Sequence, residues 1–393
     1  MFSIKLRQGG NARMTEHKKI RGMTWSDPRG YDPLVAASQT FRDRHPDADI
    51  VWDKRSLQGF ESTPVEELAE TYDLIIIDHP HVGAVVEKNC LLPIDRFAEK
   101  TALERLFAET VGKSYQSYAY DGHQWALPVD AACQVQAIRP DLVSAPVKTF
   151  SDVIALAKDG RVVWPLLAPH VLMSFFSLLA NSGAPFPVTR GTAIDHTAAL
   201  DVIGAMATLA DLVDPACLTM DPIAALDALC EDNKFALCPY VYLYAPYARA
   251  NYRANRIVFH DMPSLGASGP LGSALGGTGI AVSSQTKHPD LCVEFALWVA
   301  SADIQRGLYA THNGQPGNAV AWGDPAVNAP VGSCYSNTRM THEAAWLRPR
   351  HDGYMAFQED ASHILLDALT GKTDPKSALL ALETRFDESF DHE

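Results

Sequence analysis

The chain has 393 residues, of which 47% are hydrophobic and 20% are charged, and its formal net charge at pH 7 is −14. This length predicts two domains, each large enough to bury its own core. No apolar run approaches the ~18 residues of a membrane helix, and the negative charge would repel a phosphate backbone. A membrane span is therefore excluded, and no nucleic acid is expected as a partner.

The N-terminal segment is polar and rich in lysine and arginine. It lacks the apolar stretch of an export signal, so residues 1–19 are predicted to be a disordered polar leader. The seven cysteines are an odd number without a C-x-x-C pair or metal-ligand spacing, which predicts buried free thiols. Both features suit a reducing compartment, so a cytoplasmic location is one alternative.

The first third of the chain predicts strands alternating with helices. Residues 72–78 read YDLIIID, a β-branched run without alternation, which is typical of a strand buried on both faces of a parallel sheet. This pattern predicts an open, doubly wound α/β lobe. The expected elements are a strand at 20–25, a loop at 26–30, a helix at 31–45, a strand at 49–52 and a short helix at 65–71.

The middle of the chain predicts a second unit richer in helices. Residues 121–130, DGHQWALPVD, form a turn and a strand that leads through Cys133 into another extended stretch. The remaining expected elements are helices between 150 and 229, a strand at 234–244, a glycine-rich loop at 264–279 closed by the strand GIAVSS, a helix at 288–300 and mostly helix from 343 to 393.

Five stretches resemble, in the same order, segments of the extracellular solute-binding proteins that serve ABC transporters. They are YDLIIIDHPHVGAVVEKNCLLPID, DGHQWALPVD, KFALCPY, GGTGIAVSSQTKHPDLCVEFALWVAS and NGQPGNAVAW, which together span about residues 70 to 322. The resemblance implies an α/β, two-lobed periplasmic-binding-protein-like (type 2) fold. In such a fold hinge strands join the lobes, and the cleft between them closes on a ligand.

The order of the elements predicts lobes that are discontinuous in sequence. YDLIIID and GGTGIAVSS both have the pattern of core strands of one lobe, and the helix-rich middle lies between two crossings. We therefore expect a first lobe from residues 20–130 and 275–335 and a second lobe from 131–274. The helices of residues 336–393 are expected to pack across both.

Ligands of open α/β sheets bind beyond the carboxyl ends of the strands, which places the candidate site in the loops there. The loop after the first strand offers Trp25, Ser26, Asp27 and Arg29. Sugars need this mixture, because the C–H faces of the ring stack on aromatic side chains while the hydroxyls take hydrogen bonds. The alternative is that Trp25 packs at the lobe edge and Arg29 forms a local salt bridge.

Two other strand ends supply further candidate polar contacts. Asp78 and His79 follow the strand at 72–78, and Asp130 ends the strand where the resemblance places a crossing. Capping of the next helix is the alternative for Asp78. His79 and His81 also form a His-x-His pair that could bind a transition metal, but we expect no metal.

Alternate tyrosines at 240, 242 and 244 lie on one strand face. Tyr240 or Tyr242 is the best candidate to stack on a ligand opposite Trp25, and a lobe interface is the alternative. The glycine-rich loop lacks the lysine of a P-loop, so no nucleotide or other cofactor is expected. The remaining candidates for ligand contacts are Gly277, Thr278, Asn313, Gln315 and Arg339.

No catalytic constellation is recognisable, and no catalytic residue is predicted. Cys133 lies near the position of a nucleophilic cysteine in thiaminase I, a related bilobal fold, but is offset by about one residue. In a strand that offset turns the side chain to the opposite face, so a buried structural thiol is the expected role.

The resemblance implies the solute-binding component of an ABC transporter, which captures a small polar ligand, a sugar or sugar acid, without chemistry. It also implies a periplasmic location, a transporter permease as partner and a monomer. The alternatives are a cytoplasmic enzyme on the same scaffold and a soluble ligand sensor.

Overall fold

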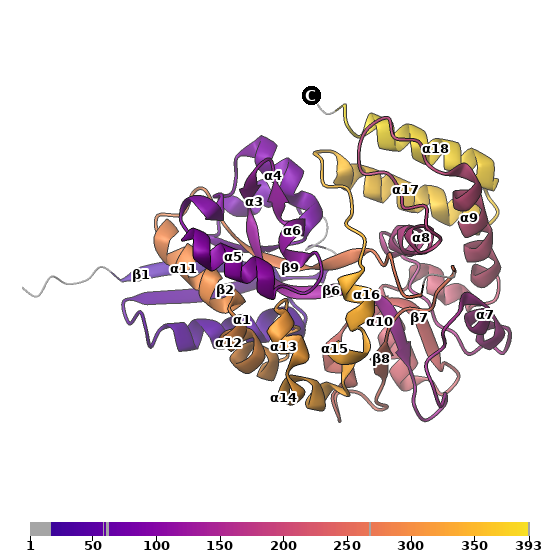
Figure 1. The fold of residues 1–393 in the computed structure, drawn as a ribbon, viewed down its shortest axis with the longest axis horizontal. Coiled ribbons are helices and arrows are strands. Elements are labelled where there is room, and N and C mark those ends of the chain that lie inside the picture. Colours follow the sequence, from indigo (N-terminus) through magenta and orange to yellow (C-terminus); the bar gives the residue numbers. More distant parts are fainter. Residues whose placement is uncertain (1–16, 58, 60–62, 267–268, 392–393) are drawn as a thin grey trace, which may run out of the picture.

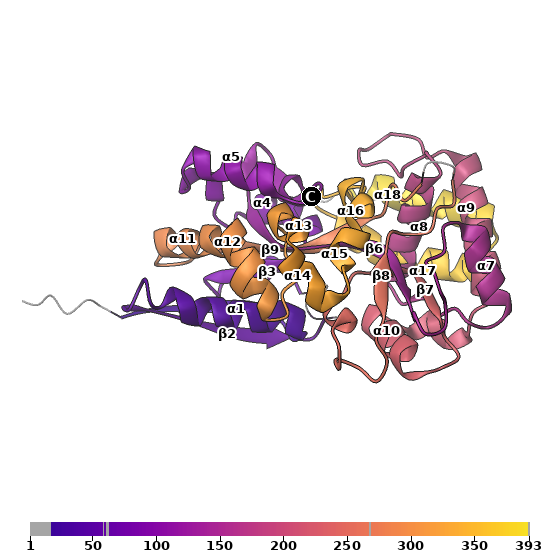
Figure 2. The same ribbon diagram turned by 60° about the horizontal axis from the view of Figure 1, so that its bottom comes forward.

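The computed structural model describes residues 17–57, 59, 63–266 and 269–391. Two lobes lie side by side along the long axis of the molecule (Figures 1 and 2). Residues 1–16 of the predicted leader lie outside the described part, but residues 18 and 19 already belong to the first strand. No helix among the described residues is both long and apolar enough to cross a bilayer.

The first lobe is built on a mixed sheet. Its strands are β1 (Lys18–Trp25), β2 (Ala48–Arg55), β3 (Leu74–Ile77), the first part of β6 (Ala126–Ile138) and β9 (Leu275–Val282), in the order β2-β1-β3-β9-β6. The predicted parallel arrangement holds for β2, β1 and β3, whereas β9 runs antiparallel to both β3 and β6.

Helices cover both faces of this sheet. Alternate residues of β3 belong to two different cores, so β3 is buried on both faces, as its sequence predicts. The helices of this lobe are α1 (Pro28–Phe41), α3 (Val65–Ala69), α4 (Val82–Lys88), α5 (Lys100–Glu109), α6 (Ser114–Ser117), α11 (Pro289–Ala300) and α12 (Ala302–Ile304). Helix α1 begins earlier than predicted because Asp27 caps it and Pro28 is its first residue.

Strand β6 runs from one lobe into the other. Its first part pairs with β9, and its last residues pair with β7 (Leu237–Tyr242) and β8 (Val258–His260) of the second lobe. Strand β9 begins at Leu275, so Gly276 and Gly277 lie in a strand and not in the predicted loop. Gly277 has φ +93°, and a Cβ there would lie 2.4 Å from the Asp130 carbonyl oxygen, so only glycine fits this crossing.

The second lobe packs helices around β7 and β8. They are α7 (Phe150–Lys158), α8 (His170–Asn181), α9 (His196–Ala210), α10 (Pro222–Glu231), α17 (Tyr354–Leu369) and α18 (Pro375–Glu388). Helices α17 and α18 pack against α9, and α17 also packs against α8, while η1 (His79–His81) of the first lobe contacts α17. The C-terminal helices therefore belong mainly to the second lobe and touch the first at η1 (Figure 1).

Short helices lie along the junction of the lobes (Figures 1 and 2). They are α13 (Ala319–Gly323), α14 (Pro325–Asn328), α15 (Cys334–Asn337) and α16 (Arg339–Glu343). Trp322 and Tyr335 pack in the core of the second lobe. Not every residue of the range 275–335 therefore packs only with the first lobe, and the assignment of this range to the first lobe stays a prediction. All seven cysteines are buried and free, which confirms the prediction of buried thiols.

Candidate functional site

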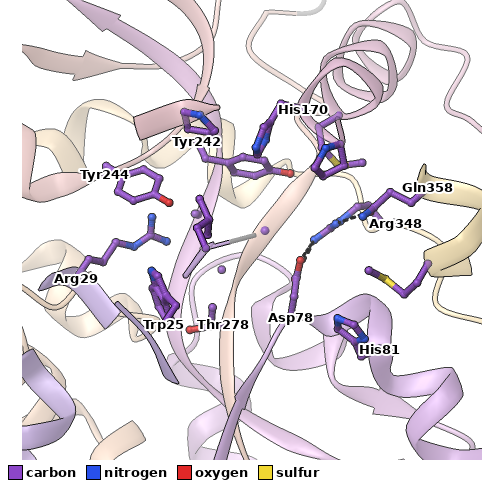
Figure 3. Close-up of a pocket in the computed structure, with 18 residues that line it drawn as sticks. Trp25, Arg29, Asp78, His81, His170, Tyr242, Tyr244, Thr278, Arg348 and Gln358 are labelled. Carbon is purple, nitrogen blue, oxygen red and sulfur yellow. Dashed lines mark hydrogen bonds and ion pairs between the residues drawn. The ribbon is translucent and has the colours of Figure 1, made fainter. Parts of the chain in front are cut away.

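A pocket with about 700 Å³ of empty space, open solvent included, lies where the two lobes meet (Figure 3). The first lobe, the second lobe and the strands that cross between them all contribute to its wall. Its lining residues are Trp25, Arg29, Leu57, Asp78, His81, Ala132, Pro169, His170, Met173, Pro222, Tyr242, Tyr244, Gly276, Gly277, Thr278, Arg348, Met355 and Gln358.

Arg29 joins the two lobes at one side of the pocket. It lies in the first turn of α1, where Asp27 accepts a hydrogen bond from its backbone N–H. The Arg29 Nε atom donates to Asp130 at 2.6 Å, and Nη1 donates to the Leu243 carbonyl of the second lobe at 2.7 Å. The guanidinium also lies 4.6 Å from the centre of the Tyr244 ring. Burial alone would lower the Arg29 pKa, but the Asp130 carboxylate outweighs burial and raises it, so Arg29 is a paired cation.

Arg348 forms the second buried ion pair of the pocket, with Asp78. Its Nη2 atom lies 2.9 and 2.7 Å from the two carboxylate oxygens, while Nε donates to the Leu275 carbonyl and Nη1 to Gln358. Burial would raise the Asp78 pKa, but the neighbouring Arg348 charge lowers it well below its usual range. Asp78 also caps η1 by accepting from the His79 backbone N–H. The pocket therefore holds two arginines, each neutralised by a carboxylate.

Three buried polar atoms in residues that line the pocket find no hydrogen-bond partner among the described residues. They are Tyr242 Oη, Thr278 Oγ1 and His170 Nδ1. The His170 ring lies edge-on to Tyr242, with 6.3 Å between ring centres. Burial lowers the His170 pKa to about 3, so the ring stays neutral at physiological pH. Buried polar groups normally have partners, so these atoms are suited to hydrogen bonds with a polar ligand.

Six of the predicted ligand contacts line the pocket: Trp25, Arg29, Asp78, Tyr242, Gly277 and Thr278. Trp25 lies on one side and Tyr242 and Tyr244 lie on the other (Figure 3). Trp25 is only 3% exposed, and its ring covers the backbone at Gly30, where a Cβ would meet it at 2.4 Å. It is therefore both a wall of the pocket and part of the first-lobe core.

The other predicted residues do not line the pocket. Asp130 lies behind Arg29, and Ser26 and Asp27 lie at the start of α1. His79 is buried edge-on against Tyr118. Tyr240 is a core residue that packs between Phe150 and Trp164, because it lies deeper on the same strand face than Tyr242.

The candidates from the C-terminal third make structural contacts. Asn313 donates to Asp32 at 2.9 Å, and Arg339 pairs with Glu343 one helical turn away. Gln315 is fully buried, where its side chain donates to the Ala131 carbonyl and accepts from the Ala245 N–H. Gln315 therefore links the segment at Ala245 in the second lobe to strand β6.

Several other residues line the pocket without having been predicted as ligand contacts. His170, Arg348 and Gln358 carried no sequence signal, whereas His81 was named only as a possible metal ligand and Tyr244 only as part of the tyrosine run. Tyr244 lies in the noted tyrosine tract, so that signal was available. His170 begins α8, and Arg348 lies in an irregular segment before α17; neither position follows a predicted strand end. Their place in the pocket depends on the packing of distant segments.

Comparison with protein families gives one match over most of the chain. Residues 44–331 match the model of the bacterial extracellular solute-binding proteins. The chain belongs to this family. The family resemblance predicted from the five sequence stretches is confirmed. No curated protein matches the sequence significantly.

Solved structures of binding proteins share the fold at low sequence identity. Maltose-bound MalE3 of T. maritima matches with a TM-score of 0.80 and 15% identity, over 94% of this chain and 99% of that one. A ribitol complex of an ABC transporter solute-binding protein from Agrobacterium radiobacter K84 matches with a TM-score of 0.79 and 16% identity, over 95% of this chain and 99% of that one. The predicted two-lobed α/β solute-binding fold is confirmed.

Proposed function

We propose that the pocket binds a small, neutral, polyhydroxylated ligand, a sugar or a polyol, for an ABC transporter. The observation that carries this proposal is the set of three polar atoms without a partner among the described residues. They belong to Tyr242, Thr278 and His170, which line a pocket walled by Trp25. Ligand hydroxyls can both donate to and accept from such atoms. The indole can pack against the C–H face of a sugar ring.

The charges of the pocket favour a neutral ligand over a sugar acid. Asp130 and Asp78 already neutralise Arg29 and Arg348, and Arg339 lies elsewhere. A ligand carboxylate would compete with these buried pairs, and the described lining residues offer no free cation to receive its charge. This choice agrees with three solved structures of similar fold, which are complexes with maltose, ribitol and D-mannitol.

Hinge closure is the mechanism that fits this geometry. The pocket wall comes from both lobes, and the connection at its base is the pair of crossing strands β6 and β9. A ligand that touches both lobes stabilises the closed arrangement over the open one. We infer that the protein acts outside the cytoplasm as a monomer, hands its ligand to a transporter permease and leaves the ligand chemically unchanged.

A thermal-unfolding screen tests the proposal. The panel pairs neutral sugars and polyols with the corresponding sugar acids at equal concentration. A true ligand present at 100 times its Kd should stabilise the fold by about 2.7 kcal/mol. A neutral compound should give the largest shift and should be recovered intact after incubation. A larger shift with the acid of any pair, or turnover of the neutral compound, would contradict the assignment.

A further inference from the structure

A second cavity lies on the other side of the segment that carries Arg348. It contains about 990 Å³ of empty space, open solvent included. Its cations are Lys113, Arg190 and Arg350; His351 and Arg348, whose charge Asp78 neutralises, also line it, and no aspartate or glutamate is among its described lining residues. The groove is therefore positively charged, although the chain as a whole has a net charge of −14. We propose that it is a binding site for a phosphate group, separate from the sugar pocket and independent of the function proposed for that pocket.

Arg350 is the cation that is held most firmly in the groove. Its Nη1 atom donates to the carbonyls of Gln116, Ser117 and Ala119 at 2.9, 2.9 and 2.8 Å, which fixes the guanidinium at the end of α6. Among the described residues no carboxylate forms an ion pair with Arg350, and partial burial lowers its pKa. A guanidinium has five N–H donors, and its Nε and Nη2 groups remain for an oxyanion.

Two further cations border the groove from different lobes. Lys113 lies between α5 and α6 of the first lobe and is exposed, and no carboxylate pairs with it among the described residues. Arg190 lies between α8 and α9 of the second lobe and pairs with Asp391 in an exposed ion pair. Exposed pairs are weak, so Arg190 can exchange or share this partner.

The chemistry of the groove fits a phosphate group, either free or as part of an ester. Arginine and lysine together recognise phosphate oxygens through charge-assisted hydrogen bonds. Beside them the groove also has an apolar wall that includes Trp346 and Phe390. That wall can hold the organic part of a phosphate ester, whereas both arginines among the described lining residues of the sugar pocket are already paired with carboxylates.

The test measures phosphate binding by titration calorimetry and thermal unfolding at constant ionic strength. The probes are inorganic phosphate and phenyl phosphate. The test variant carries Lys113→Gln with Arg190→Gln. The matched control carries Lys100→Gln with Arg42→Gln, which removes the same charge from exposed ion pairs of the first lobe outside the groove.

Wild type and control should show a saturable stabilisation, and the test variant should bind at least tenfold more weakly. Tighter binding of phenyl phosphate would assign the apolar wall to an ester, and equal binding would assign the site to the free ion; both support it. Phosphate also stabilises proteins by exclusion from their surface, in proportion to its concentration. A shift that never saturates, or that is equal in all three proteins, overturns the proposal.

Discussion

Replacing Tyr242 by phenylalanine should weaken ligand binding without lowering the stability of the ligand-free protein. Tyr242 Oη is buried without a partner among the described residues, so the ligand-free protein carries the cost of an unsatisfied hydroxyl. Removing it should leave the free energy of unfolding unchanged or raise it by about 1 kcal/mol. The bound state should lose one hydrogen bond of about 0.5 to 1.5 kcal/mol, which weakens binding roughly 2- to 13-fold.

Tyr240 provides the matched control on the same strand. Its hydroxyl donates to the Pro263 carbonyl at 3.3 Å in the core, and the residue does not line the pocket. Tyr240→Phe should therefore lower the free energy of unfolding by about 1 kcal/mol and leave the Kd unchanged. Calorimetric titration with the best compound of the neutral panel gives the Kd, and urea unfolding of ligand-free protein gives the stability. An unchanged Kd with reduced stability in Tyr242→Phe would refute the role of this hydroxyl.

Three further outcomes are expected from urea unfolding of the ligand-free protein. Gly277→Ala should lower the free energy of unfolding by more than about 1 kcal/mol, because the φ of Gly277 is +93° and β6 leaves no room for a Cβ. As a control, Gly204→Ala on the open face of α9 should raise the free energy of unfolding by about 0.5 to 1 kcal/mol. Asp78→Asn leaves the buried Arg348 without a carboxylate, so it should lower the free energy of unfolding by about 3 to 5 kcal/mol. Asp49→Asn, which breaks the surface pair with Arg42, should lower it by less than about 1 kcal/mol. Burial lowers the His170 pKa to about 3 in the folded protein, whereas the imidazole of the unfolded chain takes up a proton near pH 6.5. The free energy of unfolding should therefore fall as the pH drops from about 6.5 towards 4. His170→Gln should flatten this fall by up to about 1.4 kcal/mol per pH unit, and an unchanged slope would show that His170 titrates normally in the fold.

The sequence by itself determined the fold class and part of the site. The apolar run before Asp78 predicted a strand with both faces covered, and β3 is one. Trp25, Arg29 and Asp78 were predicted from the rule that ligands bind beyond the carboxyl ends of strands. The direction of each strand alone determines at which edge of the sheet these residues lie. The capping of α1 by Asp27 is likewise a local property, and it places Arg29 in the first turn.

The tertiary structure decided which of several equivalent residues face the pocket. Tyr240 and Tyr242 lie on one strand face, and only the packing of Phe150 and Trp164 over Tyr240 makes it a core residue. Arg348 comes from an irregular segment 270 residues after its partner Asp78, and no local pattern links them. Periodicity and strand ends report backbone geometry within one element, whereas the depth of a side chain and its partner in an ion pair depend on how distant elements pack.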